Sequence, residues 1–303
     1  MRAVIRMSNS LANLQHKISS ASDLQSVVQT MKSMAAVNIT QYENAVNSLA
    51  DYYQTVKLGL NVCFHPDTSV ISEVSHTVNT KHKNMGVIVF GSDQGLVGQF
   101  NNQLSEFLIE TLQSFLGGKY LWVIGDRIQP LLSKPDMNIG KSYRLPGSLD
   151  TISELVGELI LEIEWQRENI GISQLLVFHN TPTSISTYTA TYHKLLPFDQ
   201  NWKDELVMTE WPSRCLPELL NTKETTFKAL LREYLFVSIY KACAESLASE
   251  NASRLEAMLR AEKNIEELLD ELNKNFRQQR QTGIDEELFD LIAGYEALLE
   301  NNL

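Results

Sequence analysis

Hydrophobic residues in the first sixty positions recur with a period of seven residues. They form two series, three and four residues apart, and this spacing predicts a long helix that enters a left-handed coiled coil. One series is Leu11, Ile18, Gln25, Lys32, Ile39, Val46, Tyr53 and Leu60, and the other is Leu14, Ala21, Val28, Ala35, Tyr42, Leu49 and Val56. These fifteen positions are the N-terminal seam.

The N-terminal seam is polar only at Gln25 and Lys32. At that level the apolar residues move to neighbouring positions, namely Leu24, Val27, Met31 and Met34. The helix therefore has apolar surface on a second face, which its coiled-coil partner cannot cover. Two interpretations stay open, a local irregularity of the core and a contact with a third protein. We expect the Lys32 side chain to extend its ammonium outwards from the seam.

The end of the chain repeats the same spacing, with one polar interruption at Glu262. These positions, the C-terminal seam, are Leu255, Met258, Glu262, Ile265, Leu269, Leu272 and Phe276. Beyond Gly283 the apolar stripe continues as Ile284, Leu288, Leu291, Ile292, Tyr295, Leu298 and Leu299. An apolar stripe that its own chain leaves uncovered is typical of a binding surface.

Helix breakers are almost absent from both ends of the chain. No glycine or proline precedes Gly59, and none lies between Pro217 and Gly283. Long helices need a partner for their apolar stripes, and here each can supply the other. We expect residues 1–60 and 218–303 to pair as an antiparallel coiled-coil rod, with the C-terminal helix longer by several turns.

The middle of the chain, residues 61–217, has a different pattern. Short apolar runs at 86–90, 120–124 and 174–178 alternate with helical stretches at 102–116 and 151–168. This alternation predicts a mostly parallel sheet covered by helices, and residues 184–192 alternate like an edge strand. The predicted fold class is therefore α/β plus a long antiparallel coiled coil, with a central Rossmann-like α/β domain.

Net charge, hydropathy and cysteine content limit which kinds of protein this chain can be. The net charge of −11 argues against nucleic acid as a main partner. Residues 1–60 carry five basic and three acidic side chains, whereas 218–303 carry ten basic and seventeen acidic, which favours their lying side by side. No apolar run approaches the roughly 18 residues that cross a bilayer, and the first residues do not resemble a signal peptide. Three widely spaced cysteines suggest reduced cytosolic thiols.

One loop could carry chemistry, the segment Gly91–Gly98 between the first strand and its helix. A dinucleotide-binding fold keeps its phosphate loop there, but the glycine spacing does not fit GxGxxG or a P-loop. We interpret Gly91, Gly95 and Gly98 as parts of a tight structural turn. His179 and His193 have no further ligand at metal-binding spacing, so we interpret them as structural. We expect no catalytic residue, no metal and no cofactor.

Several motifs resemble those of one family, the γ subunit of F-type ATP synthases. Residues 30–36 are similar to its KAMKMVA stretch, 92–98 to its SDRGLCG turn, and 195–197 to its LLP. Residues 245–254 resemble ESxASExxAR, 280–288 resemble RQAAITQEL, and 294–298 resemble the GAxAL ending. Gln94, Val97, Gly283 and Asp285 depart from the family residues. The resemblance covers nearly the whole chain, and the two C-terminal motifs are its most specific part.

The resemblance implies a non-catalytic rotor subunit. The coiled coil would thread the α3β3 hexamer, and the α/β domain would contact the c-ring and the ε subunit, at the cytoplasmic face of the bacterial inner membrane as a peripheral protein. The expected rotor–stator contacts are Met31, Lys32, Arg254, Gln281, Glu287 and Leu288. Proton or sodium coupling, the direction of catalysis and the c-ring size stay open. The alternatives are a nucleotide-binding α/β enzyme and a generic coiled-coil scaffold.

Overall fold

The computed structural model describes the backbone of residues 2–64, 84–115, 117–134, 137–183, 187–208, 211–213, 215 and 217–300. Side chains are described within these ranges except at 2–10, 200, 201, 203, 207, 294 and 296–300. The chain forms two compact units, Met1–Met34 with Glu256–Leu303, and Ala35–Leu255. None of the described helices has the length and hydropathy needed to cross a membrane.

The two ends of the chain are helical, as predicted. Helices α1 (Arg2–Ser48) and α2 (Ala50–Phe64) form the start, and α7 (Lys223–Glu300) forms the end. The 78 residues of α7 extend about 117 Å at 1.5 Å per residue, and Gly283 does not interrupt them. All positions of the N-terminal and C-terminal seams are buried or half-buried, which confirms both seven-residue patterns.

In the unit of Met1–Met34 and Glu256–Leu303, the two seams pack on each other. Val28 of α1 forms an apolar cluster with Met258 and Ile265 of α7, and Met31 and Leu269 pack against it. Leu24, Val27 and Met34, in contrast, are exposed by 53%, 54% and 61%. The second apolar face predicted for α1 is therefore present.

In the unit of Ala35–Leu255, contacts fix the direction of pairing. The Asn38 amide donates a hydrogen bond to Asn251 Oδ1 at 3.4 Å, and the Tyr52 hydroxyl donates to Glu233 Oε2 at 2.6 Å. The later residue of α1 and α2, Tyr52, therefore contacts the earlier residue of α7, Glu233. The helices are antiparallel in this unit, as predicted.

The first long helix is divided at Leu49, which was not predicted. The Ser48 hydroxyl donates to the Ala45 carbonyl at 2.9 Å, and the Leu49 N–H donates to the Val46 carbonyl at 3.3 Å. A side chain that competes for backbone carbonyls loosens the regular i→i−4 pattern, and the chain continues as α2 at Ala50.

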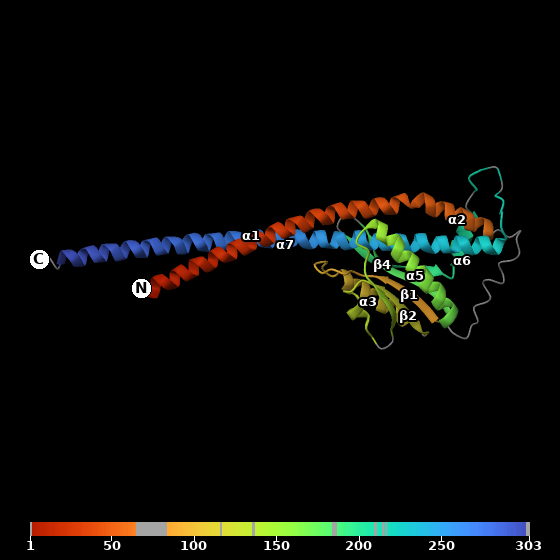
Figure 1. Ribbon diagram of the computed structural model, residues 1–303, viewed down its shortest axis with the longest axis horizontal. Coiled ribbons are helices and arrows are strands. Elements are labelled where there is room, and N and C mark those ends of the chain that lie inside the picture. The colour runs from red at the N-terminus through yellow and green to blue at the C-terminus, as the bar shows by residue number, and fades with distance from the viewer. Residues whose placement is uncertain are drawn as a thin grey trace. The chain divides into compact units, whose positions relative to one another are not determined.

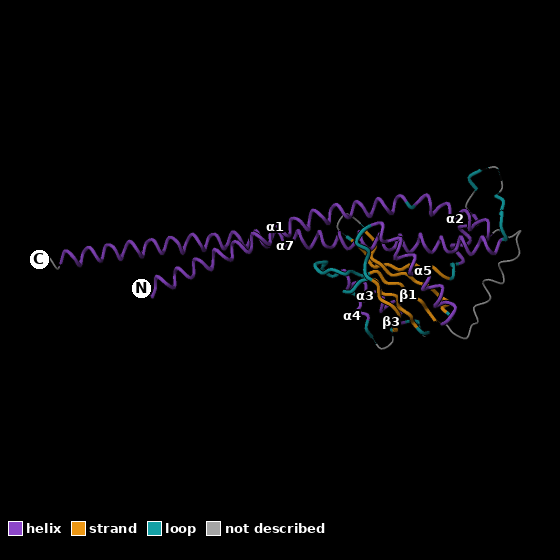
Figure 2. The backbone as a smooth tube through the Cα atoms, viewed as in Figure 1, coloured by secondary structure: helices purple, strands orange, loops and turns teal. Residues whose placement is uncertain are grey.

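The central domain is a five-stranded sheet in the order β3-β2-β1-β4-β5 (Figures 1 and 2). Its strands are β1 (Asn84–Phe90), β2 (Lys119–Ile124), β3 (Asn138–Tyr143), β4 (Ile172–Pro182) and β5 (Tyr188–Leu196). The first four are parallel and β5 is an antiparallel edge strand. The predicted strands and the edge position of the last one are confirmed, although residues 184–186 lie outside the described residues.

Helices cover both faces of the sheet. Met85, Val87 and Val89 of β1 pack with α3 (Phe100–Gln113) and α4 (Gln129–Leu132). The alternate residues Ile88 and Phe90 pack with α5 (Leu149–Ile170) and with α7. The short α6 (Gln200–Met208) contacts α2. Thus one face of the sheet rests on α7, and the carboxyl ends of its strands approach that helix.

Candidate functional site

The turn after β1 is held by its own side chains. Ser92 N–H donates to Asn101 Oδ1 at 3.0 Å, and the Asn101 amide donates to Ser92 Oγ at 2.7 Å. The Asp93 carboxylate accepts the N–H groups of Asp126 and Leu145, both at 2.9 Å. The Asp93 carboxylate therefore lies at the carboxyl edge of the sheet, where a dinucleotide-binding fold would hold an anion.

The three glycines of this turn differ in what they do. A Cβ atom at Gly91 would lie 2.4 Å from the side chain of Ile128. Only glycine therefore allows the backbone just after β1 to pass this close to Ile128. Gly98 has a φ of +55°, a conformation that glycine adopts without strain. Gly95 has open space around it, and the neighbouring positive φ, +62°, falls on Leu96.

Three serines of α7 attach the sheet to the helix. Ser246 Oγ donates to the Phe90 carbonyl at 3.1 Å, Ser249 Oγ donates to the Asn180 carbonyl at 2.9 Å, and Ser253 Oγ donates to the Val97 carbonyl. The spacings of three and four residues place all three hydroxyls on one face of the helix. They are almost fully buried and together form the serine joint, which ties the ends of β1 and β4 and the Gly91–Gly98 turn to α7.

A buried charged pair lies beside the serine joint. Arg254 Nη2 donates to Glu250 Oε1 at 2.6 Å, and Arg254 Nη1 donates to Asn251 Oδ1 at 3.1 Å. Burial raises the pKa of Glu250, and the charge of Arg254 offsets only part of that effect. The spacing of four residues lets the two charges meet on one helix, so this part of α7 holds a charge inside the protein.

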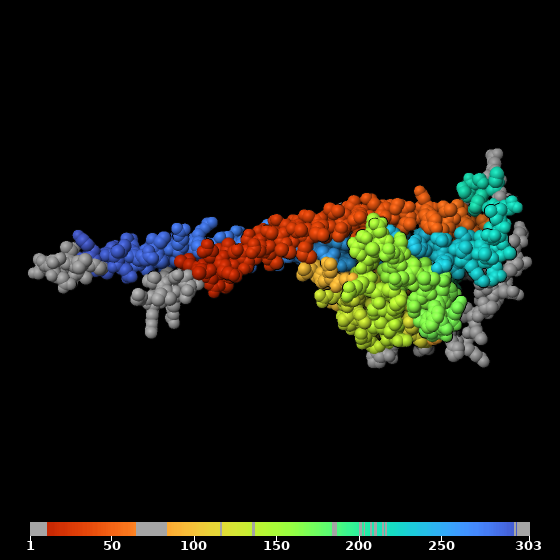
Figure 3. Space-filling model, viewed as in Figure 1, coloured from red at the N-terminus to blue at the C-terminus, as the bar shows by residue number. Residues whose placement is uncertain are grey.

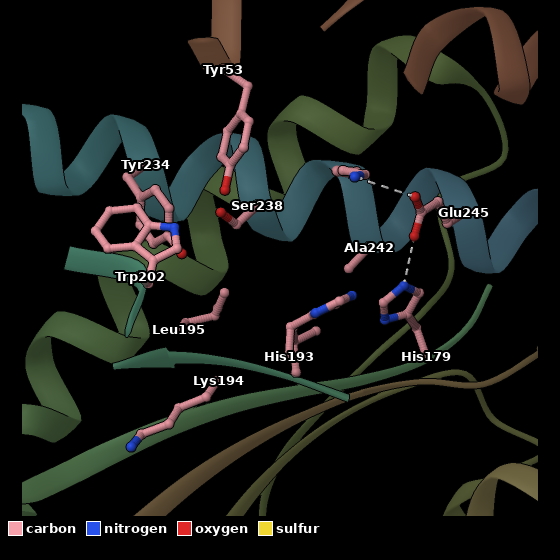
Figure 4. A pocket seen from close by; sticks show the side chains of 12 residues that line it. Tyr53, His179, His193, Lys194, Leu195, Trp202, Tyr234, Ser238, Ala242 and Glu245 are labelled. Carbon is pink, nitrogen blue, oxygen red and sulfur yellow. Dashed lines mark hydrogen bonds and ion pairs between the residues drawn. The ribbon is translucent and has the colours of Figure 1, made fainter. Parts of the chain in front are cut away.

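A second polar group lies between α7 and strands β4 and β5. His179 is fully buried, and its Nε2–H donates to Glu245 Oε2 at 2.8 Å. The ring centres of His179 and His193 are 5.5 Å apart, and both rings line a cavity of about 210 Å³ (Figure 4). Burial is the main effect that lowers the pKa of His193, and the nearby His179 adds to it.

The predicted rotor–stator residues lie in three separate surroundings. Met31 is half-buried against the Val28 cluster, and Arg254 is buried in its pair with Glu250. Gln281, Glu287 and Leu288 are exposed on α7. Arg254 belongs to the compact unit of Ala35–Leu255, and the other five residues belong to the unit of Met1–Met34 and Glu256–Leu303.

Lys32 differs from the prediction that its ammonium extends outwards. Its Nζ donates to both carboxylate oxygens of Glu262, at 2.8 and 2.6 Å. Lys32 of the N-terminal seam therefore faces Glu262, the polar position of the C-terminal seam. The ion pair holds the ammonium at the seam because a carboxylate is within reach and half-buried there.

The apolar stripe near the end of α7 is exposed, as predicted. The exposed fraction of its large side chains runs from 46% at Ile292 to 72% at Leu291. The other exposed members are Ile284, Leu288, Phe289 and Tyr295. Figure 3 shows the blue part of α7 with its side chains uncovered on the face turned to the viewer. The side chains of Leu298 and Leu299 lie outside the described residues.

Sequence reasoning missed the serine joint, the His179–Glu245 contact and Phe289. The three serines were visible at a helical spacing, and a polar stripe within a buried helix could have indicated their role. The contact of His179 with Glu245 joins residues 66 positions apart, for which no local pattern exists.

Comparison with known proteins gives one consistent match. A family described as ATP synthase matches residues 10–298. The chain is 24% identical to the ATP synthase gamma chain of Bdellovibrio bacteriovorus, over 95% of this chain and 99% of that protein.

Solved structures of similar fold come from the mitochondrial ATP synthase of Euglena gracilis. A chain of its rotor, in rotational state 1, matches with a TM-score of 0.61 at 13% identity, over 91% of this chain and 99% of that one. A chain of its OSCP/F1/c-ring structure, in rotational state 3, matches with a TM-score of 0.64 at 13% identity, over 96% and 95% of the two chains.

Proposed function

Because the chain belongs to the ATP synthase γ-subunit family, we propose that it works as the central rotor shaft of an F-type enzyme. It carries rotation between the membrane c-ring and the catalytic α3β3 hexamer, and it is not catalytic itself. The observation that carries this proposal is the exposed apolar stripe from Ile284 to Tyr295 at the end of a 78-residue helix.

The stripe requires a partner. Covering a large apolar side chain stabilises by roughly 1.5–3 kcal/mol when burial is complete, and six described residues of the stripe are exposed. A sleeve formed by α and β subunits supplies the missing contact. Aliphatic contacts without fixed charge pairs also suit a sleeve in which a shaft turns.

Coupling follows from unequal contacts. One helix pair inside a ring of three β subunits cannot touch all three alike, so each β subunit has its conformational equilibrium shifted differently. Gln281, Ile284 and Leu288 share one face of α7 because they are three and four residues apart. We assign the rotor–stator contact to Gln281, Glu287 and Leu288 and to the apolar face of α1 beside Met31 and Lys32. We also propose Arg254, which forms a buried ion pair with Glu250, as a residue of the rotor–stator contact.

The turn at Gly91–Gly98 argues against the nucleotide-binding alternative. The Ser92 N–H already donates to Asn101, and the Asp93 carboxylate accepts N–H groups that follow β2 and β3. The negative charge of Asp93 in this turn repels an anion. We propose that the isolated chain neither binds nor hydrolyses ATP. Measurable hydrolysis by the purified chain, lost on Gly98→Ala, contradicts this.

The remaining assignments rest on the family. We propose residues 1–60 and 218–303 as the shaft and 61–217 as the domain that faces the c-ring and the ε subunit. Its four parallel strands in the order β3-β2-β1-β4 support describing the domain as Rossmann-like, whereas the antiparallel edge strand β5 departs from that pattern. The complex would lie at the cytoplasmic face of a bacterial inner membrane, with this chain peripheral to the bilayer.

Co-expression with the α and β subunits of the same enzyme tests the proposal. We expect an ATPase-active α3β3γ complex to co-purify with this chain. The variant Leu288→Asp/Leu291→Asp should weaken co-purification, and Asp290→Asn, on the same segment, should not. Failure of the unmodified chain to join an otherwise active hexamer would overturn the shaft assignment.

A further inference from the structure

His179 and His193 stand on one face of the sheet because of the strand pairing. His193 of β5 is opposite Val177 of β4, while His179 is opposite Thr191. The two histidines are therefore diagonal neighbours, and alternate residues of a strand point to the same side. That side is the one on which α7 contributes Glu245 and Lys241 to the cavity.

The buried ring of His179 has one nitrogen without a partner. Nε2 donates to Glu245, with the Thr181 hydroxyl also 3.1 Å from it. Nδ1 is fully buried and has no hydrogen-bond partner among the described residues. In Figure 4 the nitrogen of His179 that does not face Glu245 points towards the His193 side of the cavity. In the neutral ring with its proton on Nε2, Nδ1 carries a free lone pair.

This arrangement matches the known surroundings of a metal-bound imidazole. A histidine that ligates a metal usually donates its other N–H to a carboxylate, which fixes the tautomer and the ring orientation. A zinc ion binds histidine nitrogen at about 2.0–2.1 Å, so two rings on one tetrahedral ion have centres about 5–5.5 Å apart. The observed separation is 5.5 Å, with the rings tilted by 37°.

We propose that His179 and His193 bind one divalent transition-metal ion of the zinc, cobalt and nickel type, with Glu245 as the positioning residue for His179. Imidazole is a ligand that suits these ions. The described residues offer no group of three or more His, Cys, Asp or Glu side chains for a metal. Water in the adjacent cavity completes the coordination. The ion joins β4 to the edge strand β5 and, through Glu245, joins both to α7.

Charges around the cavity set the strength of binding. Glu245 contributes a negative charge, and Lys241 Nζ lies 3.7 Å from Glu245 Oε1, which partly cancels it. Lys194 also belongs to the cavity lining, but Figure 4 shows its ammonium directed away from the two histidines. With two protein ligands and this balance of charge, we expect weaker binding than at a site with four protein ligands.

The test uses the full chain in a background without competing ligands. The background variant replaces four histidines by Asn and one cysteine by Ser, at His16, His65, His76, His82 and Cys215. His179 and His193 are then the remaining histidines of the chain. Co²⁺ titration should give visible d–d absorption that saturates at one ion per chain and disappears on addition of Zn²⁺. Zn²⁺ should also raise the thermal unfolding midpoint, as expected for a ligand of the folded state.

Three variants and one control locate the site. His193→Asn, on an exposed edge position, should abolish both signals, and His179→Gln should do the same. Glu245→Gln should keep the stoichiometry and weaken binding by about 10–100-fold, the usual effect of losing an orienting carboxylate. Lys194→Gln is the control, because the Lys194 ammonium points away from the two histidines. This variant should bind Co²⁺ with an affinity within about twofold of that of the background variant. Lack of Co²⁺ binding at about 1 mM, or unchanged binding by His193→Asn, would overturn the proposal. Metal binding is measured on the isolated chain, so its failure can be told apart from a failure to assemble with α and β subunits.

Discussion

The ion pair between Lys32 of α1 and Glu262 of α7 allows a direct test of what stabilises the packing of these two helices. Lys32 and Glu262 face each other from the two seams, and their side chains are 31% and 16% exposed. Replacing both by leucine, Lys32→Leu/Glu262→Leu, continues the apolar seams. Replacing Lys32 alone leaves a half-buried carboxylate without its partner. The single and double variants should therefore change stability in opposite directions.

The magnitudes follow from the burial of the pair. Removing one partner of a fully buried pair costs 3–5 kcal/mol, whereas an exposed pair contributes about 0–1 kcal/mol. At this intermediate exposure we expect Lys32→Leu to lower the unfolding free energy by about 1–2 kcal/mol. Exchanging a buried pair for apolar residues often stabilises by 1–4 kcal/mol, and we expect about 1–2 kcal/mol here because water still reaches Lys32.

Amide hydrogen exchange is the suitable assay because the chain has two compact units, and a global melt would mix them. Protection of residues 258–269 reports the unit that contains the pair. The control is Lys263→Leu, which removes a largely exposed i,i+4 partner of Glu267 and should change protection by less than about 0.5 kcal/mol. If Lys32→Leu and the double variant shift protection equally, the ion pair has no energetic role and the reasoning fails.

Three further predictions concern other parts of the molecule. Ser249→Ala should lower the unfolding free energy of the sheet unit by about 1–2 kcal/mol, measured by urea unfolding, because the buried Asn180 carbonyl loses its donor; Thr282→Ala, whose hydroxyl bonds only within α7, is the control and should be neutral. Deleting residues 289–303 should leave the isolated chain's unfolding midpoint nearly unchanged, since the described side chains removed are exposed, yet should lower the stability or turnover of the α3β3γ complex; unfolding of the isolated chain on truncation contradicts the shaft assignment. A thiol reagent at pH 8 should label Cys215 rapidly and Cys63 and Cys243 only after unfolding, because both are buried and burial raises both pKa values; rapid labelling of Cys243 in the folded chain would show that the helix packing around it opens.

The sequence predicted the features that depend on local pattern. The seven-residue period identified both seams, and apolar runs identified β1, β2 and β4, because a strand buried on both faces is almost continuously hydrophobic. Strand β3 was missed because most of its side chains are exposed and no alternation marks it. The break at Leu49 was missed because Ser48 acts through a hydrogen bond rather than through a breaker residue.

Features that depend on how distant segments meet could not be predicted. Gln25, Lys32 and Glu262 were visible as polar seam positions, but the pairing of Lys32 with Glu262 depends on how far the helices are offset. The approach of His179 to His193 depends on the hairpin pairing of β4 and β5. Arg254 was assigned to a surface contact, although Glu250 four residues before it was a signal for a buried pair.

The pairing of Lys32 with Glu262 affects how easily α1 and α7 can slide along each other. A coiled coil of plain apolar repeats can slip by one heptad with little loss, because every layer resembles the next. Here a slip in one direction would set Lys32 against Leu269 and Glu262 against Ile39, and a slip in the other would set Lys32 against Leu255 and Glu262 against Gln25. Either slip leaves both charges without an oppositely charged partner. Leaving a buried charge unpaired costs several kcal/mol, so the aligned arrangement is favoured over the slipped one. A twisting load on the two helices is then passed along them as rotation rather than lost as axial slippage.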